Sequence, residues 1–414
     1  MKKSYYLLVV GLFLLILALV IVSPVVTTEA AVKKAPPKPT LSQIIAEVSK
    51  TFFKNSEMKK EPSKYGGSVP YSHLEESPYL KTLWEGMPFS KDYNEDRGHY
   101  YALEDVKSTK RLSPATPMTC MTCKSSNVPA AMKKYGDAYY TLPMLVYQDE
   151  FKHSIGCSDC HDLKTYKLVI TRPAFVEAMK RRGIDVTKAS QSQMRTYVCA
   201  QCHVEYFFDP QNGKKLTFPW DKGFDPENIY QYYEERGFAD WTNPSTFVKE
   251  LKAQHPEFEM FQGSTHQKAG ATCADCHMPR KTVTSGKLTF TVASHQWTSP
   301  LKDMSSCKKC HTKDAKFLTE RVFYIQDRVK AAIDRAGEAN AETLRTIKSV
   351  AAGTYDPAIL AEAQKLQRES QWYWDYVAAE NSIGFHNPSK AFATLNKSIE
   401  LAYQARLKAL EAKK

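Results

Sequence analysis

CMTCK at residues 120–124 is the first of five pentapeptides that decide the fold of this 414-residue chain. The other four read CSDCH at 157–161, CAQCH at 199–203, CADCH at 273–277 and CKKCH at 307–311. Together they use all ten cysteines of the chain. A disulfide framework would rarely place every cysteine in a CxxC pair. The spacing therefore indicates attachment of a cofactor or a metal.

Four of the five pairs are followed directly by histidine, and CxxCH is the attachment signature of c-type haem. Each thiol adds to one vinyl group of the haem, and the histidine binds the iron. Zinc ribbons also use CxxC pairs, but they combine two pairs per metal and would leave one pair of five unmatched. The sequence predicts five haem c groups, attached at Cys120, Cys123, Cys157, Cys160, Cys199, Cys202, Cys273, Cys276, Cys307 and Cys310, with His161, His203, His277 and His311 as iron ligands.

The first motif differs from the others because Lys124 stands where they have histidine. A lysine that ligates iron must bind as a neutral amine, which donates electron density without accepting any back. The alternative is a degenerate motif whose haem finds another ligand or is never attached. We interpret Lys124 as the iron ligand of a haem with a special task.

The remaining histidines support this interpretation. Electron-transfer haems are usually six-coordinate, so four further histidines could complete the four CxxCH haems and leave the Lys124 haem with an open face. Such a face is where a substrate binds. Seven histidines remain to supply these ligands: His73, His99, His153, His255, His266, His295 and His386.

The overall composition is that of a globular protein with a basic surplus. The chain has 57 basic and 45 acidic side chains and a formal charge of +12. No glycine-rich phosphate loop, zinc-finger spacing or basic aromatic patch accompanies that charge, so we expect no nucleic-acid partner. The ten propionates of five haems would nearly cancel it.

The chain divides into regions of different character. Residues 1–31 contain Lys2 and Lys3 before an apolar run, which predicts an export signal that is either cleaved or retained as a membrane anchor. Residues 32–40 form a Pro/Lys-rich linker. We expect residues 41–311 to bind the haems, which serve as their core, and residues 312–414 to form long helices over 313–351, 356–384 and 388–412. The predicted fold is mainly α, with little β structure.

One CxxCK motif ahead of four CxxCH motifs makes the chain resemble the ammonia-forming pentahaem cytochrome c nitrite reductases. The resemblance extends from about residue 60 to the C-terminus. It implies distal ligands at His99 in RGHYYALEDV for the third haem, His266 for the fifth, His295 in SHQWTSPL for the second and His386 in GFHNP for the fourth. His73 and His153 are left as ordinary polar residues.

The resemblance also implies an active site and a calcium site. Arg111, Tyr206 and His255 match the family's catalytic residues, with Lys124 as the iron ligand. In CHVEY and KAQH, the Glu205 carboxylate, the Tyr206 and Lys252 carbonyls and the Gln254 side chain match its Ca²⁺ ligands. Oxygen ligands suit this hard cation.

By this resemblance the expected activity is the six-electron reduction of nitrite to ammonium outside the cytoplasm. The family takes electrons from a membrane-bound multihaem quinol dehydrogenase or a soluble multihaem cytochrome, and its long helices form a homodimer. Two alternatives stay open, namely a multihaem electron-transfer cytochrome and a reductase of another small molecule such as sulfite or hydroxylamine. Lys124 and the surplus His255 favour the enzyme over the carrier.

Overall fold

The computed structural model describes residues 38–50, 62–67, 69–297 and 299–414. The predicted export segment, residues 1–31, and most of the predicted linker lie outside these ranges. Among the described residues, no helix is both long and apolar enough to cross a membrane.

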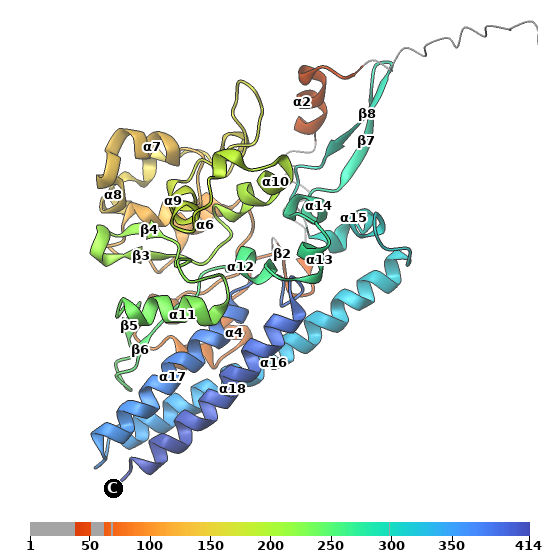
Figure 1. Cartoon of the computed structure of the whole chain (residues 1–414). Helices are drawn as coiled ribbons and strands as arrows, with labels where there is room; N and C mark the ends of the chain where they lie inside the picture. The colour runs from red at the N-terminus through yellow and green to blue at the C-terminus, as the bar shows by residue number, and fades with distance from the viewer. Residues whose placement is uncertain (1–37, 51–61, 68, 298) are drawn as a thin grey trace, which may run out of the picture.

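Helices dominate the described chain, which confirms the prediction of a mainly α fold. Most of them are short in the first three quarters of the sequence, and the last three are long (Figure 1). They are α2 Leu41–Ser49, α4 His73–Glu76, α5 Leu80–Leu83, α6 Ala102–Ser108, α7 Val128–Tyr135, α8 Met144–Tyr147, α9 Pro173–Arg181, α10 Gln191–Ala200, α11 Pro226–Glu235, α12 Glu257–Phe261, α13 Thr265–Lys268, α14 Cys273–His277, α15 Ser305–Lys308, α16 Ala315–Ala351, α17 Pro357–Ala378 and α18 Pro388–Glu411.

The described strands form four separate antiparallel pairs. The pair β7–β8 is the longest, with Arg280 opposite Ala293 and Ser285 opposite Leu288. Gly286 has φ +62° in its tight turn, a conformation that suits glycine. The strands are β1 Pro62–Ser63, β2 Gly66–Gly67, β3 Phe207–Asp209, β4 Lys215–Thr217, β5 Trp241–Thr242, β6 Lys249–Glu250, β7 Arg280–Ser285 and β8 Leu288–Ala293.

The three long helices α16, α17 and α18 lie side by side as a bundle at one end of the molecule (Figure 1). Trp372, Trp374 and Tyr376 of α17 are buried in its core. Tyr79, just before α5, approaches α16 so closely that a Cβ at Gly337 would lie 2.3 Å from its ring, so only glycine fits there. The aromatic side chains Trp372, Trp374 and Tyr376 of α17 therefore pack inside the subunit.

The second long helix is shorter than its composition predicts. It ends at Ala378 rather than near residue 384. After it the Glu380 carboxylate accepts hydrogen bonds from the Ser382 hydroxyl and the Gly384 N–H, and Ile383 and Gly384 have φ of 50° and 73°. These contacts close a turn that delivers His386 to the interior, so the helix has to stop earlier.

A second hydrophobic cluster lies within the haem-binding part. Its buried members include Met118, Met121, Phe175, Phe218 and Trp220. The sequence predicts that the haems serve as the core of this region. The protein also supplies a conventional apolar core beside the motifs, which gives the short helices α6 to α10 a packed support.

Candidate active site

The CxxCH motifs share one local geometry. The His161 N–H donates to the Cys157 carbonyl at 2.9 Å, and the same bond recurs between His203 and Cys199 at 3.0 Å and between His311 and Cys307 at 3.0 Å. The fourth motif is itself helix α14, Cys273–His277. In a helical turn, residues three and four apart lie on one face. Each motif thus presents two thiols and one imidazole to the same side.

All ten cysteines are free of disulfide bonds. The Cys123 thiol lies beside that of Cys202, and the Cys199 thiol lies beside that of Cys273. The third motif is therefore a direct neighbour of both the first and the fourth, although long stretches of chain separate them. Neighbouring attachment sites would hold neighbouring haems, as electron transfer between haems requires.

The structure brings together the histidine pairs named from the sequence. Ring centroids lie 5.8 Å apart for His99 and His203, 6.2 Å for His161 and His295, 6.3 Å for His266 and His311 and 6.3 Å for His277 and His386. Two metal–nitrogen bonds of about 2.0 Å and two ring radii of about 1.2 Å would put the centroids of trans imidazoles about 6.4 Å apart. Each pair therefore fits an iron between its rings.

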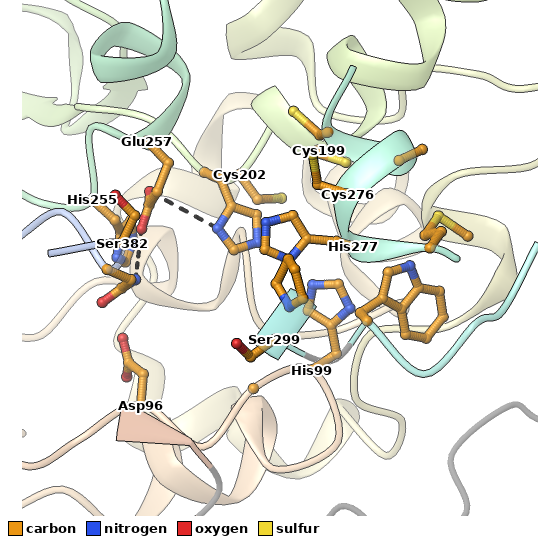
Figure 2. Close-up of a pocket in the computed structure, with 18 of the residues that line it drawn as sticks. Asp96, His99, Cys199, Cys202, His255, Glu257, Cys276, His277, Ser299 and Ser382 are labelled. Atoms are coloured by element: carbon orange, nitrogen blue, oxygen red, sulfur yellow. Dashed lines mark hydrogen bonds and ion pairs between the residues drawn. The ribbon is translucent and has the colours of Figure 1, made fainter. Parts of the chain in front are cut away.

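These groups line one cavity of about 2780 Å³. Ordinary small-molecule pockets have volumes of about 300–1,000 Å³, so this one has room for several large groups. Cys199, Cys202, Cys276, His277 and His99 gather on one side of the view in Figure 2. Thiols, paired imidazoles and space together fit covalently bound haems.

Lys124 lines the same cavity and has a rigid backbone support. The buried Arg172 guanidinium donates to the carbonyls of Thr122 at 2.6 Å and Ser125 at 3.1 Å, on both sides of Lys124. It also donates to the Asp159 carboxylate at 2.6 Å. Sequence reasoning missed Arg172, whose partners lie far from it along the chain.

His255 and Arg111 line the cavity with Lys124. Burial, together with the nearby Lys124 charge, lowers the pKa of His255 to about 4, so its imidazole is neutral at pH 7. The Arg111 guanidinium stacks over the Phe89 ring at 4.1 Å. The Tyr206 ring centroid lies 5.9 Å from that of His255, and burial raises the pKa of its phenol. The structure thus groups all four residues that the resemblance names as catalytic.

Asp96 is a further acidic group in this part of the cavity, and the sequence reasoning did not name it. Burial alone would raise the pKa of Asp96, but the nearby Lys124 and Arg111 side chains hold this pKa below its ordinary value. Its position three residues before His99 was the available signal.

The four residues named for calcium also lie together. The buried Glu205 carboxylate accepts from the Gln254 N–H at 2.6 Å and the Tyr233 hydroxyl at 2.8 Å. The Gln254 amide lies 3.2 Å from the Lys252 carbonyl. Burial raises the pKa of Glu205 well above its usual range, which a bound cation would offset. One carboxylate with carbonyl and amide oxygens fits Ca²⁺.

The Lys252 side chain takes no part in the candidate calcium site, which uses only the carbonyl of this residue. Its ammonium pairs with the buried Asp375 carboxylate of α17 at 3.0 Å, and Asp375 also accepts from the Ala253 N–H at 2.6 Å. Helix α17 therefore holds the segment that carries Gln254 and His255. Asp375 is the charged residue inside the aromatic run QWYWDY at 371–376, and this position was a signal for a buried charge partner.

Two further carboxylates contact the Nδ1 atoms of histidines that are predicted to bind haem iron. Glu380 accepts from His386 Nδ1 at 2.5 Å, and Glu257 lies 3.9 Å from His203 Nδ1. The other two contacts of this kind use backbone carbonyls, through Nδ1 of His161 to Tyr166 and Nδ1 of His295 to Ala293. These contacts occupy Nδ1 and leave Nε2 as the nitrogen available to a metal, the arrangement typical of metal-bound histidines.

Fold and site together define a multihaem c-type cytochrome in which one motif carries lysine. A model of the cytochrome c552 family matches residues 45–414, and the chain belongs to that family. It is an oxidoreductase of the cytochrome c nitrite reductase type.

The sequence similarity to relatives extends over most of their length. The chain is 37% identical to the cytochrome c nitrite reductase subunit NrfA of Nitratidesulfovibrio vulgaris, over 84% of this chain and 74% of that protein. It is 39% identical to cytochrome c-552 of Bacteroides thetaiotaomicron, over 88% and 73%. The solved catalytic subunit NrfA of Desulfovibrio desulfuricans, described with two calcium sites, superposes with a TM-score of 0.82 at 36% identity, covering 89% of this chain and 84% of that one.

Proposed function

We propose that this protein reduces nitrite to ammonium at the haem of the Lys124 motif and that the four haems with paired histidines feed it electrons. One observation carries the proposal. Four histidine pairs account for the four CxxCH motifs. Lys124 instead shares its cavity wall with Arg111 and His255, and Tyr206 lies beside His255.

The side chains around Lys124 suit an anionic substrate. A haem held by Cys120, Cys123 and Lys124 would supply an iron that could bind the anion and deliver electrons. Arg111 and the neutral His255 donate hydrogen bonds to the nitrite oxygens, and the Arg111 charge attracts the anion. Because its pKa is raised, Tyr206 stays a protonated phenol that donates to later, more reduced species.

Calcium would act on this site indirectly. Bound by Glu205, the carbonyls of Tyr206 and Lys252 and the Gln254 side chain, it would hold Tyr206 and His255 in place. It would also offset the negative charge of the buried Glu205.

The cellular setting follows from the same assignment. We propose an extracytoplasmic protein, exported by residues 1–31, that takes electrons from a multihaem quinol dehydrogenase or a soluble multihaem cytochrome. We also propose a homodimer formed through the long helices. Its support is an exposed apolar stripe on α18 formed by Tyr403, Leu407 and Leu410, which are 53%, 63% and 51% exposed.

The test is an anaerobic assay of the haem-loaded protein with a reduced viologen dye and nitrite. We expect ammonium to match the nitrite lost, with six electrons taken per nitrite. Protein that holds all five haems but forms no ammonium would favour the electron-carrier alternative. Parallel assays with sulfite and hydroxylamine compare the other substrates.

A further inference from the structure

His73 lies in an acidic and aromatic cluster outside the residues assigned so far. Its Nε2 is 3.2 Å from Glu95 Oε2, and its Nδ1 is 3.6 Å from Glu76 Oε2. The rings of Tyr71 and Tyr93 flank it, with centroids 4.9 and 4.6 Å away. An imidazole between two carboxylates can accept a proton on one nitrogen and release one from the other.

The cluster runs inward from the surface. The side chain of Glu76 is 40% exposed, that of His73 is 23% exposed and that of Glu95 is 14% exposed. Glu95 lines the haem cavity, and so does the next residue, Asp96. Contacts link Glu76, His73 and Glu95, and Glu95 and the adjacent Asp96 both line the cavity, so the series leads from the surface to the cavity wall.

The inner end of the series lies at the candidate active site. Lys124, Arg111 and His73 lie within electrostatic range of Asp96, which lines the same cavity as His255. In Figure 2 Asp96 lies on the same side of the pocket as His255. A proton that reaches Asp96 is thus close to the groups that bind nitrite.

Other charged groups face the outer end. Lys330 of α16 lies 3.9 Å from Glu76 and 2.7 Å from Asp334, and the Tyr71 hydroxyl bonds to Glu95.

We propose that Glu76, His73, Glu95 and Asp96 form a proton-delivery chain into the active site. The inference rests on the proposed function, in which one nitrite, six electrons and eight protons give one ammonium and two waters. The electrons come from the donor through the haems, and the protons come from solvent. Each transfer breaks one N–H or O–H bond and forms another, so no group in the chain is consumed.

The test uses variants that keep the shape of the cluster. His73→Phe preserves the packing between Tyr71 and Tyr93 but cannot carry a proton, and Glu95→Gln preserves the size of the side chain. The matched control is His153→Phe, because His153 is exposed and outside the cluster. We expect kcat to fall about tenfold or more in the first two variants and to stay unchanged in the control.

Three readouts separate proton delivery from a structural role. We expect the nitrite affinity of the oxidised protein and its haem spectrum to stay as in wild type. The solvent deuterium isotope effect on kcat should rise, and the loss should deepen as pH increases.

Two results would overturn the chain while leaving the proposed function intact. One is wild-type kcat in both variants, and the other is a loss of kcat with an unchanged solvent isotope effect. Wild-type protein that forms no ammonium would instead overturn the proposed function, and the chain with it.

Discussion

Lys124 has a local environment that fixes its backbone on both sides through Arg172. An imidazole in its place would differ in reach and in electronic character from a primary amine. We expect Lys124→His to keep the haem content but to lower nitrite turnover by about a hundredfold. Haem quantification and ammonium assays check this. The exposed Lys133→His is the control, and full activity of Lys124→His would contradict the special role of the lysine.

Glu380 makes a short contact to a predicted iron ligand, His386. A carboxylate partner increases the basicity of an imidazole and so stabilises the oxidised metal. We expect Glu380→Gln to raise the reduction potential of one low-spin haem. A potentiometric titration followed by optical spectroscopy measures this. The exposed Glu338→Gln should leave every potential unchanged, and unchanged potentials in Glu380→Gln would refute the effect.

At the scale of elements, α17 fixes the 252–255 segment through Asp375. Asp375→Asn leaves the Lys252 ammonium buried without its charge partner, a change that costs about 3–5 kcal/mol. We expect a lower apparent Tm and faster loss of calcium to a chelator, with excess Ca²⁺ partly restoring stability. Metal analysis and thermal unfolding test this. Glu362→Gln, exposed on the same helix, is the control, and unchanged calcium retention in Asp375→Asn would contradict the coupling.

The predictability of these elements depends on how local their causes are. The CxxC motifs and the long helices depend on residues that lie close together in the sequence, so both could be predicted from it. The end of α17 could not, because it depends on the Glu380 side chain and on the positive φ of Ile383 and Gly384. The roles assigned to the individual site residues stay predictions.

Contacts across the whole molecule were the hardest to predict. Lys252 and Asp375 are 123 positions apart, and Arg172 bonds a carbonyl 50 positions away. The hydrophobic periodicity of the sequence does not indicate contacts between residues so far apart. The distal histidines were named only through the family resemblance, since spacing alone left seven candidates for four positions.

The proposed homodimer would form through the exposed stripe of α18. Tyr403, Leu407 and Leu410 follow one helical face, and contiguous apolar surface of this kind marks interaction sites. We expect Leu407→Glu to convert a dimer into a monomer without loss of haem, because the interface would bury an unpaired charge. Light scattering with haem quantification measures both. Val146→Glu, at a 70% exposed apolar residue away from the long helices, is the control. A Leu407→Glu protein that remains dimeric would exclude this stripe as the interface.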